Sequence, residues 1–394
     1  MMIDLPNRIK EVSISSFGQH AGRLAQPAGY AFYYESPDCP PCSLNMPLRD
    51  APYNYGELHP VFRQNLPEGY VRRYIAERLE RYATVNDLYL LALQRDNGIG
   101  HITVESTIVA GNNEQLSLDD ILHWRGSKPI FAELLDRYYL SGILSGVQPK
   151  VMVPISGRST IHQNDLIVKT FDDEFEQLTV NEYICMSAAK HVGLNPPNFW
   201  LSDDHMSFVI ERFDINDGQQ LAFEDFTVLT GQPKYRGKYE TLMRATWDYT
   251  HSQEQMERMY RYIIFNCLIG NGDAHLKNFA LQYSQDRQNI TLTPPYDITH
   301  TLIYPHLDNT MALKMKGAKI FPDRKTLTNF GVPFGLRNGQ AIIEEYADLL
   351  NDFYQSFDAI NLMPGLKDSL RKSLSSAMIY SEGAFRHDKK PKYK

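Results

Sequence analysis

The chain has 394 residues, enough for one large domain or two to three ordinary ones. Its hydrophobic fraction of 43% and charged fraction of 22% are globular values and exclude a disordered chain. A net charge of −7 argues against a protein that binds nucleic acid over its whole surface. Residues 1–4 lack the basic start of a signal peptide, and the apolar run 262–265 meets Asn266 too soon to cross a membrane. We therefore expect a cytoplasmic protein without membrane attachment.

The first block, residues 1–105, is expected to mix short strands with a polar helix at 71–82. It also holds Cys39 and Cys42, whose spacing suits half of a zinc site or a redox dithiol. The chain has four cysteines, which fits a reducing compartment. The sequence has no second C-x-x-C pair and lacks the βαβ setting of a thioredoxin site, so loop cysteines are the default interpretation.

The second block, residues 106–218, is expected to be rich in strands. Residues 151–155, a turn at 156–157 and a short β-branched strand that carries Lys169 predict a hairpin.

A helix is predicted after this strand. Its apolar stripe is formed by residues at helical spacing, and Gly193 supplies a stop: Leu178, Cys185, Ala189 and Val192. Glu182 lies on the same stripe, 13 residues after Lys169. We therefore expect Glu182 to point inward and to hold the lysine in place.

The third block, residues 219–394, changes to a helical pattern. Helices are predicted at 239–249, 253–269, 340–353 and 366–380. The tail at 389–394 is basic and interrupted by proline, which indicates either a frayed end or a contact with nucleic acid.

The most informative stretch is the loop after the second of these helices, where four residues separate Asp273 from Asn278. This is the D-x-x-x-x-N spacing of a kinase catalytic loop, in which the Asp orients the attacking hydroxyl and the Asn holds a metal. Asp297 follows 24 residues after Asp273 and supplies a second carboxylate. Together with Lys169 and Glu182, these residues appear in the order that a kinase requires.

Each residue would then have a role in phosphoryl transfer from ATP. Lys169 would hold the α- and β-phosphates, Asn278 and Asp297 would hold Mg²⁺, and Asp273 would take or orient the proton of a Ser or Thr hydroxyl. Lys277 is placed to approach the γ-phosphate.

His275 either contacts the nucleotide or braces the loop. Residues 207–213, with Glu211 and Phe213, are expected to form a hinge whose backbone holds adenine. Taken singly, these residues also have plain interpretations: a solvated strand-edge lysine, a surface glutamate or a turn-forming aspartate.

The series of motifs resembles the HipA-like serine/threonine kinases, toxins of bacterial toxin–antitoxin pairs. The resemblance covers nearly the whole chain and rests on the following segments: 17–24, 43–48, 62–69, 145–150, 181–183, 211–214, 271–278 and 295–297.

The resemblance implies an α+β, two-lobed, kinase-like fold. Residues 1–105 would be an extra amino-terminal subdomain, 106–218 the β-rich kinase lobe and 219–394 the helical catalytic lobe. It also implies a HipB-like helix-turn-helix antitoxin as partner, so that DNA is reached only through the antitoxin. The expected substrate class is a protein, possibly an aminoacyl-tRNA synthetase.

The loop around Ser145, Gly146, Val147 and Gln148 is similar to the family's glycine-containing phosphate loop. Its backbone amides are suited to cradle phosphate. In the family this loop is often switched by autophosphorylation, but the position three before the glycine, where several members carry the modified serine, is Ile143 here. Ser145 is the nearer candidate, because a phosphate there would add negative charge beside the nucleotide.

Two other functions stay open. One is a kinase of a lipid or small molecule, which would show a basic or amphipathic docking face. The other is a silent kinase that only binds the antitoxin and assists repression. Against the second, every polar residue that the chemistry needs is present.

Overall fold

The computed structural model describes residues 5–95, 98–106, 108, 116–139, 159–163, 166–171, 173–216 and 219–379. The chain begins with an antiparallel sheet whose strand order is β4-β3-β2-β1-β5. Its strands are β1 (Glu11–Ser16), β2 (Gln19–Ala25), β3 (Tyr30–Tyr34), β4 (Tyr53–Tyr55) and β5 (Ile102–Glu105). Phe17 and Gly18, both with positive φ, form the tight turn between β1 and β2.

Short helices lie between and after these strands in the chain. They are α1 (Pro60–Arg63), α2 (Gly69–Leu79), α3 (Asp87–Gln94), α4 (Leu118–Leu122) and α5 (Ile130–Tyr139). Of these, α3 packs against β1 and β5 of this sheet. The predicted helix at 71–82 corresponds to α2. The Asn86 side chain accepts a hydrogen bond from the Tyr89 amide at 2.8 Å and so fixes the start of α3.

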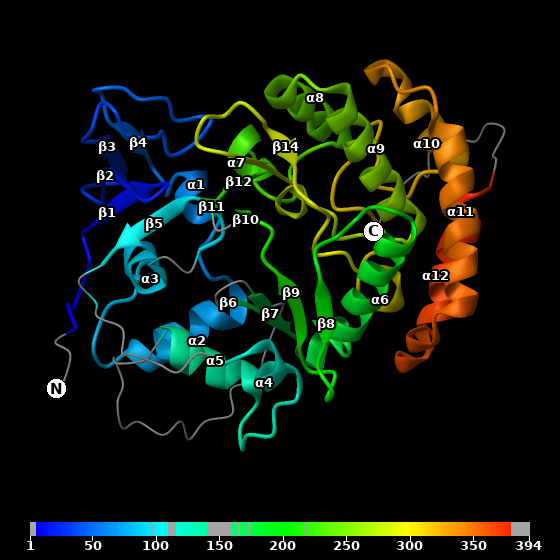
Figure 1. Cartoon of the computed structure of the whole chain (residues 1–394), viewed down its shortest axis with the longest axis horizontal. Coiled ribbons are helices and arrows are strands. Elements are labelled where there is room, and N and C mark those ends of the chain that lie inside the picture. Colours follow the sequence, from blue (N-terminus) through cyan, green and yellow to red (C-terminus); the bar gives the residue numbers. More distant parts are fainter. Residues whose placement is uncertain are drawn as a thin grey trace, which may run out of the picture.

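A second antiparallel sheet lies at the centre of the chain (Figure 1), in the order β6-β7-β9-β8. Its strands are β6 (Ser159–Gln163), β7 (Leu166–Thr170), β8 (Phe199–Leu201) and β9 (Phe208–Glu211). β7 pairs with β6 on one edge and with β9 on the other. The predicted hairpin between 151–155 and the Lys169 strand is therefore wrong, because β6 takes that edge; the residues at 151–158 lie outside the described part. Polar His162 and Gln163 in β6 hid the strand from the hydrophobic pattern.

Helix α6 (Leu178–His191) lies beside the central sheet and has the predicted inward face. Glu182 is 2% exposed, and the stripe from Leu178 to Val192 is buried. The helix ends at Gly193, whose φ of +82° is a conformation that suits glycine.

The rest of the chain is mainly helical, as predicted. Its helices are α7 (Phe226–Thr230), α8 (Tyr239–Thr250), α9 (Gln253–Leu268), α10 (Arg324–Phe330), α11 (Gly339–Ser356) and α12 (Leu366–Ala377). A small sheet of β12 (Ala222–Asp225), β13 (Ala280–Tyr283) and β14 (Thr291–Leu292) flanks the catalytic loop, and β10 (Ile215–Asn216) pairs with β11 (Gln219–Gln220).

Two hydrophobic cores meet at the central sheet. Val168 and Val209 are paired neighbours on one face of the sheet and join the core of the first block. Ile167 and Ile210, one residue along on each strand, face the core of the helical block. The alternation of side chains along a strand therefore buries both faces. Lys169 shares the second face, so its side chain points toward the helical block.

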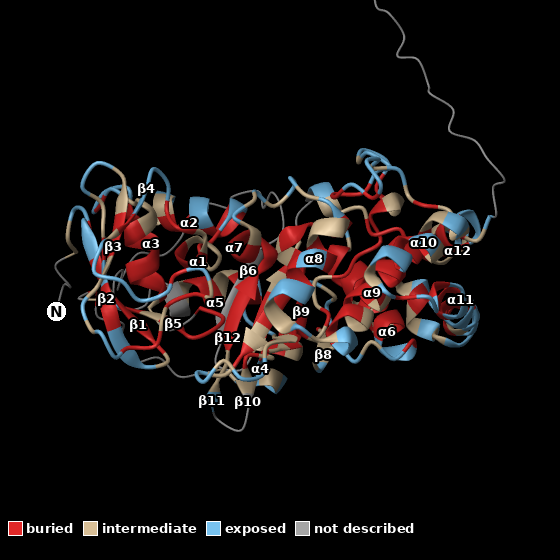
Figure 2. Cartoon of the chain, turned by 90° about the horizontal axis from the view of Figure 1, so that it is seen from above, coloured by how far each residue is buried: buried red, intermediate tan, exposed pale blue. Residues whose placement is uncertain are grey.

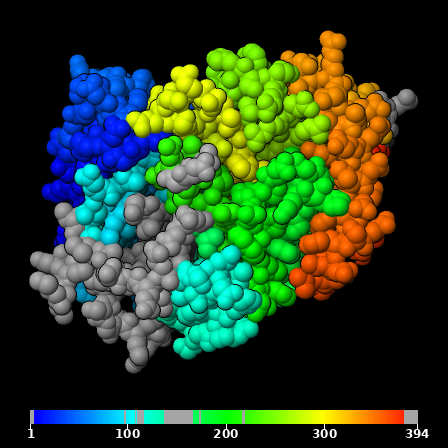
Figure 3. All heavy atoms as spheres, in the orientation of Figure 1, coloured from blue at the N-terminus to red at the C-terminus, as the bar shows by residue number. Residues whose placement is uncertain are grey.

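The views of the whole molecule agree with this division. Buried residues run through the interior of both halves, with exposed residues on the outer helices and loops (Figure 2). The blue first block and the orange helices α10–α12 lie on opposite sides of the molecule, with green and yellow residues between them (Figure 3). Among the described residues, no helix combines the length and the apolar character that a membrane span needs.

Candidate active site

The loop that carries Asp273 is fixed by its own polar residues. Gly270 ends α9 with a φ of +70°. The Asn271 amide nitrogen then donates to Asn266 Oδ1 at 2.7 Å, and Asn271 Oδ1 accepts from the Asp273 backbone amide at 3.1 Å. A Cβ at Gly272 would lie 2.6 Å from the Thr310 carbonyl oxygen. The close packing at this position requires glycine and holds the loop in one path.

Asp273 is contacted from the side by an aromatic residue that the sequence reasoning did not single out. The Tyr235 hydroxyl donates to Asp273 Oδ1 at 3.2 Å, and the Tyr235 ring lies edge-on to His275 at 5.1 Å between centroids. His275 is itself buried. This arrangement favours the bracing role for His275.

Four residues from four separate segments form what we call the deep cluster: Lys169, Glu182, Asn278 and Asp297. Lys169 Nζ donates to Glu182 Oε1 at 2.6 Å and to Asp297 Oδ1 at 3.1 Å. The side chains of Lys169, Glu182 and Asp297 are only 12%, 3% and 21% exposed. The predicted pairing of Lys169 with Glu182 is thus present in the structure, and Asp297 closes it from the helical block.

Asn278 and Asp297 offer oxygen ligands suited to Mg²⁺. The Asn278 amide nitrogen donates to Asp297 Oδ2 at 2.9 Å and to its carbonyl at 3.1 Å. Asn278 Oδ1 is buried and has no hydrogen-bond partner among the described residues. Mg²⁺ usually takes few protein oxygens and completes its shell with phosphate and water. This amide oxygen, beside a carboxylate, fits such an ion.

Asp297 adopts a backbone conformation that non-glycine residues rarely use, with φ of +56°. The preceding Tyr296 holds this turn, since its hydroxyl donates to the Lys277 carbonyl at 2.8 Å and its carbonyl accepts from the Tyr262 hydroxyl at 2.9 Å. Such conformations persist where the surroundings fix them, often at functional sites.

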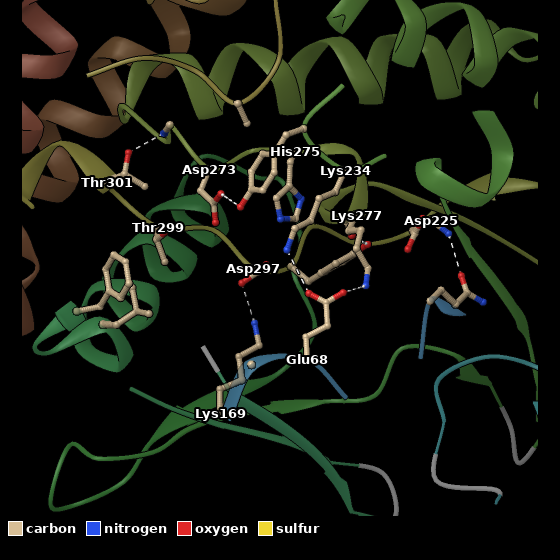
Figure 4. Close-up of a pocket in the computed structure, with 18 of the residues that line it drawn as sticks. Glu68, Lys169, Asp225, Lys234, Asp273, His275, Lys277, Asp297, Thr299 and Thr301 are labelled. Atoms are coloured by element: carbon tan, nitrogen blue, oxygen red, sulfur yellow. Dashed lines mark hydrogen bonds and ion pairs between the residues drawn. The ribbon is translucent and has the colours of Figure 1, made fainter. Parts of the chain in front are cut away.

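These residues border a cavity of about 770 Å³ between the central sheet and the helical block (Figure 4). Its polar and charged lining includes Lys169, Asp273, Lys277 and Asp297. Its apolar and aromatic lining includes Ile99, Ile167, Ile210, Phe213, Phe223 and Tyr296. Phe213 stacks on Tyr296 at 5.2 Å. A cavity that offers both a flat aromatic surface and lysine side chains suits a molecule that joins a planar ring to phosphates.

A buried hydrogen-bond network lies behind the catalytic loop. Asn181, one residue before Glu182 on α6, donates from its amide to the His300 carbonyl at 2.8 Å and accepts from the His300 backbone amide at 2.8 Å. The His300 ring bonds the Ile269 carbonyl through Nδ1 and the Ser369 hydroxyl through Nε2. Burial lowers the pKa of His300 to about 4, so the ring is neutral and Nδ1 carries the proton.

The structure brings most of the predicted residues together. Those that line the cavity are Lys169, Phe213, Asp273, His275, Lys277 and Asp297. Glu182 and Asn278 stand directly behind them, bonded to lining side chains. Glu211 is not among the lining residues, and its side chain bonds Asn198 at 2.8 Å. Ser145, Gly146, Val147 and Gln148 lie outside the described residues.

Sequence reasoning predicted Lys277 but missed its two partners in a group that we call the lysine bridge: Glu68, Lys234 and Lys277. Lys277 Nζ donates to Glu68 Oε1 at 2.9 Å, and Lys234 Nζ donates to Glu68 Oε2 at 3.1 Å. Figure 4 shows Glu68 approaching from the side of Lys169, with the two lysines opposite. Since Glu68 stands 166 residues before Lys234, no local sequence pattern links the two residues. Glu68 does lie in segment 62–69, one of those on which the resemblance to the HipA-like kinases rests.

Asp225 also lines the cavity without having been predicted. It accepts from the backbone amides of Thr227 and Val228 and so begins α7. Burial raises the pKa of its carboxyl, and Lys277 partly offsets that effect.

Cys39 and Cys42 are free, buried thiols, and Cys39 Sγ donates to the Ser36 carbonyl at 3.2 Å. In the part of the chain that the structure describes, no group of three or more His, Cys, Asp or Glu side chains is arranged to hold a metal. The interpretation as loop residues agrees with this packing.

Comparisons with known proteins match both halves of the chain. A family model of the HipA-like C-terminal domain matches residues 142–353, and one of the HipA N-terminal domain matches residues 12–105. The protein Y4dM of Sinorhizobium fredii, whose name proposes a kinase, is 29% identical over 301 residues, 68% of each chain. The serine/threonine-protein kinase toxin HipA of Shewanella oneidensis is 25% identical over 199 residues, 43% of this chain and 46% of that one.

A solved structure gives the fold. It is the complex of HipA, HipB and operator DNA from the Shewanella oneidensis MR-1 toxin–antitoxin system, with a TM-score of 0.67 at 17% identity. The match covers 93% of this chain and 96% of that one. It confirms the predicted α+β, two-lobed, kinase-like fold. With the C-terminal family model covering more than half of its length, the chain belongs to the HipA-like family.

Proposed function

We propose that this chain is an ATP- and Mg²⁺-dependent serine/threonine protein kinase and the toxin of a toxin–antitoxin pair. One observation carries the proposal: Lys169, Glu182 and Asp297 form a chain of contacts of 2.6 and 3.1 Å that faces the same cavity as Asp273. Lysine, acidic brace, catalytic aspartate and metal ligand are the parts that phosphoryl transfer needs in one place.

The cavity suggests how ATP lies. The adenine ring would rest against Ile210 and Phe213, where a stacked aromatic pair and aliphatic side chains give a flat apolar surface. Main-chain groups from Glu211 to Phe213 are the predicted partners of the adenine edge. The phosphates would then extend toward Lys169, whose ammonium is held in place by two carboxylates.

Asp273 would orient the attacking hydroxyl of the protein substrate and accept its proton. The new bond joins that oxygen to the γ-phosphorus, while the bond from the γ-phosphorus to the bridging oxygen breaks and ADP leaves. Tyr235 bonds Asp273 Oδ1, which fixes the direction of the carboxylate. Asn278 and Asp297 would hold Mg²⁺, which when bound supplies positive charge at the phosphate oxygens.

We also propose a partner and a substrate class on the basis of family membership. The solved relative stands in a complex with HipB and operator DNA, which supports a HipB-like antitoxin for this chain and DNA contact through that antitoxin. We propose a protein substrate, with an aminoacyl-tRNA synthetase as the first candidate, and a cytoplasmic location.

The test is incubation of the purified protein with ATP, Mg²⁺ and a cell extract, followed by phosphopeptide mass spectrometry. The matched variants are Asp273→Ala and, as control, Asp286→Ala, which changes an aspartate in the exposed turn after β13. We expect phosphorylated proteins with the native chain and the control and none with Asp273→Ala, although that variant still binds ATP. Transfer at the native rate by Asp273→Ala would refute the assigned role.

The same spectra test autophosphorylation. We propose Ser145 as the modified residue, because a phosphate there would place about 1.5 to 2 negative charges beside the nucleotide. Finding Ser145 unmodified after incubation with ATP would remove this part of the proposal.

A further inference from the structure

The lysine bridge is an ion cluster that spans the two sides of the cavity. Glu68 belongs to the first block and immediately precedes α2, whereas Lys234 and Lys277 belong to the helical block. Each carboxylate oxygen of Glu68 takes one ammonium group, at 2.9 Å from Lys277 and 3.1 Å from Lys234. Two ammonium groups thus converge on one small anion.

The helical block brings the two lysines together without help from Glu68. The Leu276 backbone amide donates to the Lys234 carbonyl at 3.1 Å, so the segments that carry Lys234 and Lys277 lie side by side. The Tyr235 ring against His275 adds a second contact between the same segments. Because the two ammonium groups repel each other, the pair favours any anion that binds between them.

In the part of the chain that the structure describes, Glu68 makes no other side-chain hydrogen bond or ion pair. It stands at the N-cap position of α2, yet its side chain makes no capping hydrogen bond there. Its side chain is 55% exposed, while those of Lys234 and Lys277 are 36% and 24% exposed. Exposed ion pairs are weak, and water readily replaces one partner. The carboxylate is therefore able to leave.

The position of the pair matches the path of the phosphates. Lys277 comes from the same loop as Asp273, the proposed base, and Asn278, a proposed metal ligand, and it lines the same cavity as Asp273. A terminal phosphate held for transfer must lie near Asp273 and Asn278 in this cavity, so Lys277 is a candidate to contact its oxygens. A Glu68 oxygen already occupies hydrogen-bonding distance from this nitrogen, so the carboxylate and a phosphate oxygen compete for it.

We propose that Glu68 is a stand-in for phosphate, that Lys234 and Lys277 together bind the terminal phosphate of ATP, and that ATP displaces Glu68 from them. The inference rests on the proposed function and adds Lys234 as a residue that contacts the transferring group. Because Glu68 competes only with the terminal phosphate, it lowers the affinity for ATP and leaves ADP nearly unaffected. Partial desolvation of the half-exposed Glu68 carboxylate raises its pKa, and the two lysines lower it to a net value of about 2, so the competitor is charged at neutral pH.

The experiment measures the dissociation constants of Mg²⁺-ATP and Mg²⁺-ADP by calorimetry for the native chain and three variants. Glu68→Gln keeps the size of the side chain and removes the competing charge; we expect about fivefold tighter ATP binding and less than about twofold change for ADP. Lys234→Met should weaken ATP by about tenfold and spare ADP. The control is Glu57→Gln, an exposed glutamate of the same block that pairs with Arg63 at 2.9 Å; both constants should stay native.

The possible results separate the inference from the proposed function. Equal changes for ATP and ADP, or unchanged ATP binding in Glu68→Gln, would overturn the competition. An unchanged ATP constant in Lys234→Met would remove Lys234 from the phosphate site. If the native chain bound neither Mg²⁺-ATP nor Mg²⁺-ADP, the proposed function and this inference would both be overturned. Binding that follows the expected pattern without transfer to any protein would leave the inference standing and refute only the kinase assignment.

Discussion

The deep cluster and the lysine bridge each pair lysine ammonium groups with carboxylates at similar N–O distances, yet their surroundings differ. In the deep cluster Lys169 and Glu182 are 12% and 3% exposed and sit on a strand and a helix that are packed on both sides. In the lysine bridge Glu68 is 55% exposed and precedes a short helix. A buried ion pair resists the removal of either partner, whereas an exposed pair exchanges partners at little cost. The first is suited to hold phosphates in a fixed place, and the second to respond to them.

The largest effect is expected in the deep cluster. Glu182→Ala removes one of the two carboxylates that contact Lys169, Asp297 being the other. We expect it to lower the free energy of unfolding by about 3 kcal/mol. Urea denaturation measures this loss. Glu176→Ala, which removes an exposed glutamate just before the same helix, is the control. A loss below about 1 kcal/mol would place the buried pair in the same class as surface pairs.

The loop in front of Asp273 gives the next effect. In Gly272→Ala the new Cβ would lie 2.6 Å from the Thr310 carbonyl and 2.7 Å from Thr301 Oγ1, so the backbone must shift. We expect a loss of about 2 kcal/mol in unfolding free energy and a lower transfer rate. Gly56→Ala is the matched control, since nothing lies within 4 Å of its added Cβ. Native stability in Gly272→Ala would show that the loop is not tightly packed.

The third prediction concerns the network behind the deep cluster. The folded pKa of His300 is about 4, below its ordinary value of 6.5, so the unfolded chain binds a proton that the folded chain excludes. Stability is therefore full above pH 6.5 and falls toward pH 4 by about 1.4 kcal/mol per pH unit for this group. His300→Gln removes this titrating group and should therefore remove its contribution of about 1.4 kcal/mol per pH unit to the pH dependence of the unfolding free energy. Urea denaturation at several pH values measures that dependence. His251→Gln, at the end of α8, serves as control, and an unchanged slope in His300→Gln would contradict the prediction.

The smallest effect on stability is expected in the lysine bridge. Glu68→Ala should change the free energy of unfolding by less than about 1 kcal/mol, because exposed ion pairs contribute little. The same urea titration as for Glu182→Ala gives a direct comparison. A loss as large as that of Glu182→Ala would mean that Glu68 clamps the two blocks together, and the contrast between the clusters would disappear.

The sequence predicted the parts of this site that local patterns encode. The apolar stripe from Leu178 to Val192 placed Glu182 on the inner face of α6, and the strand before Lys169 identified β7. The helices α8, α9, α11 and α12 also lie where the hydrophobic spacing indicated. In each case the residues that define the element are neighbours in the chain, so their period reveals the structure.

What the sequence could not predict depends on residues far apart in the chain. The convergence of Glu68 with Lys234 and Lys277, and the contact of Tyr235 with Asp273, arise only when the blocks pack together. The strand β6 was missed for another reason: its polar residues give no apolar alternation, and pairing with β7 decides its structure. The block boundaries at 105 and 218 stay predictions.

The central sheet has a consequence for how the chain folds. One face of β7 and β9 buries Val168 and Val209 in the first core, and the other buries Ile167 and Ile210 in the second. The strands β7 and β9 therefore contribute side chains to both cores. If either half unfolded, the apolar face that these strands bury in it would be exposed to water. The two halves should therefore melt in a single cooperative transition, and fragments cut between them should be insoluble alone but recover their fold when co-expressed.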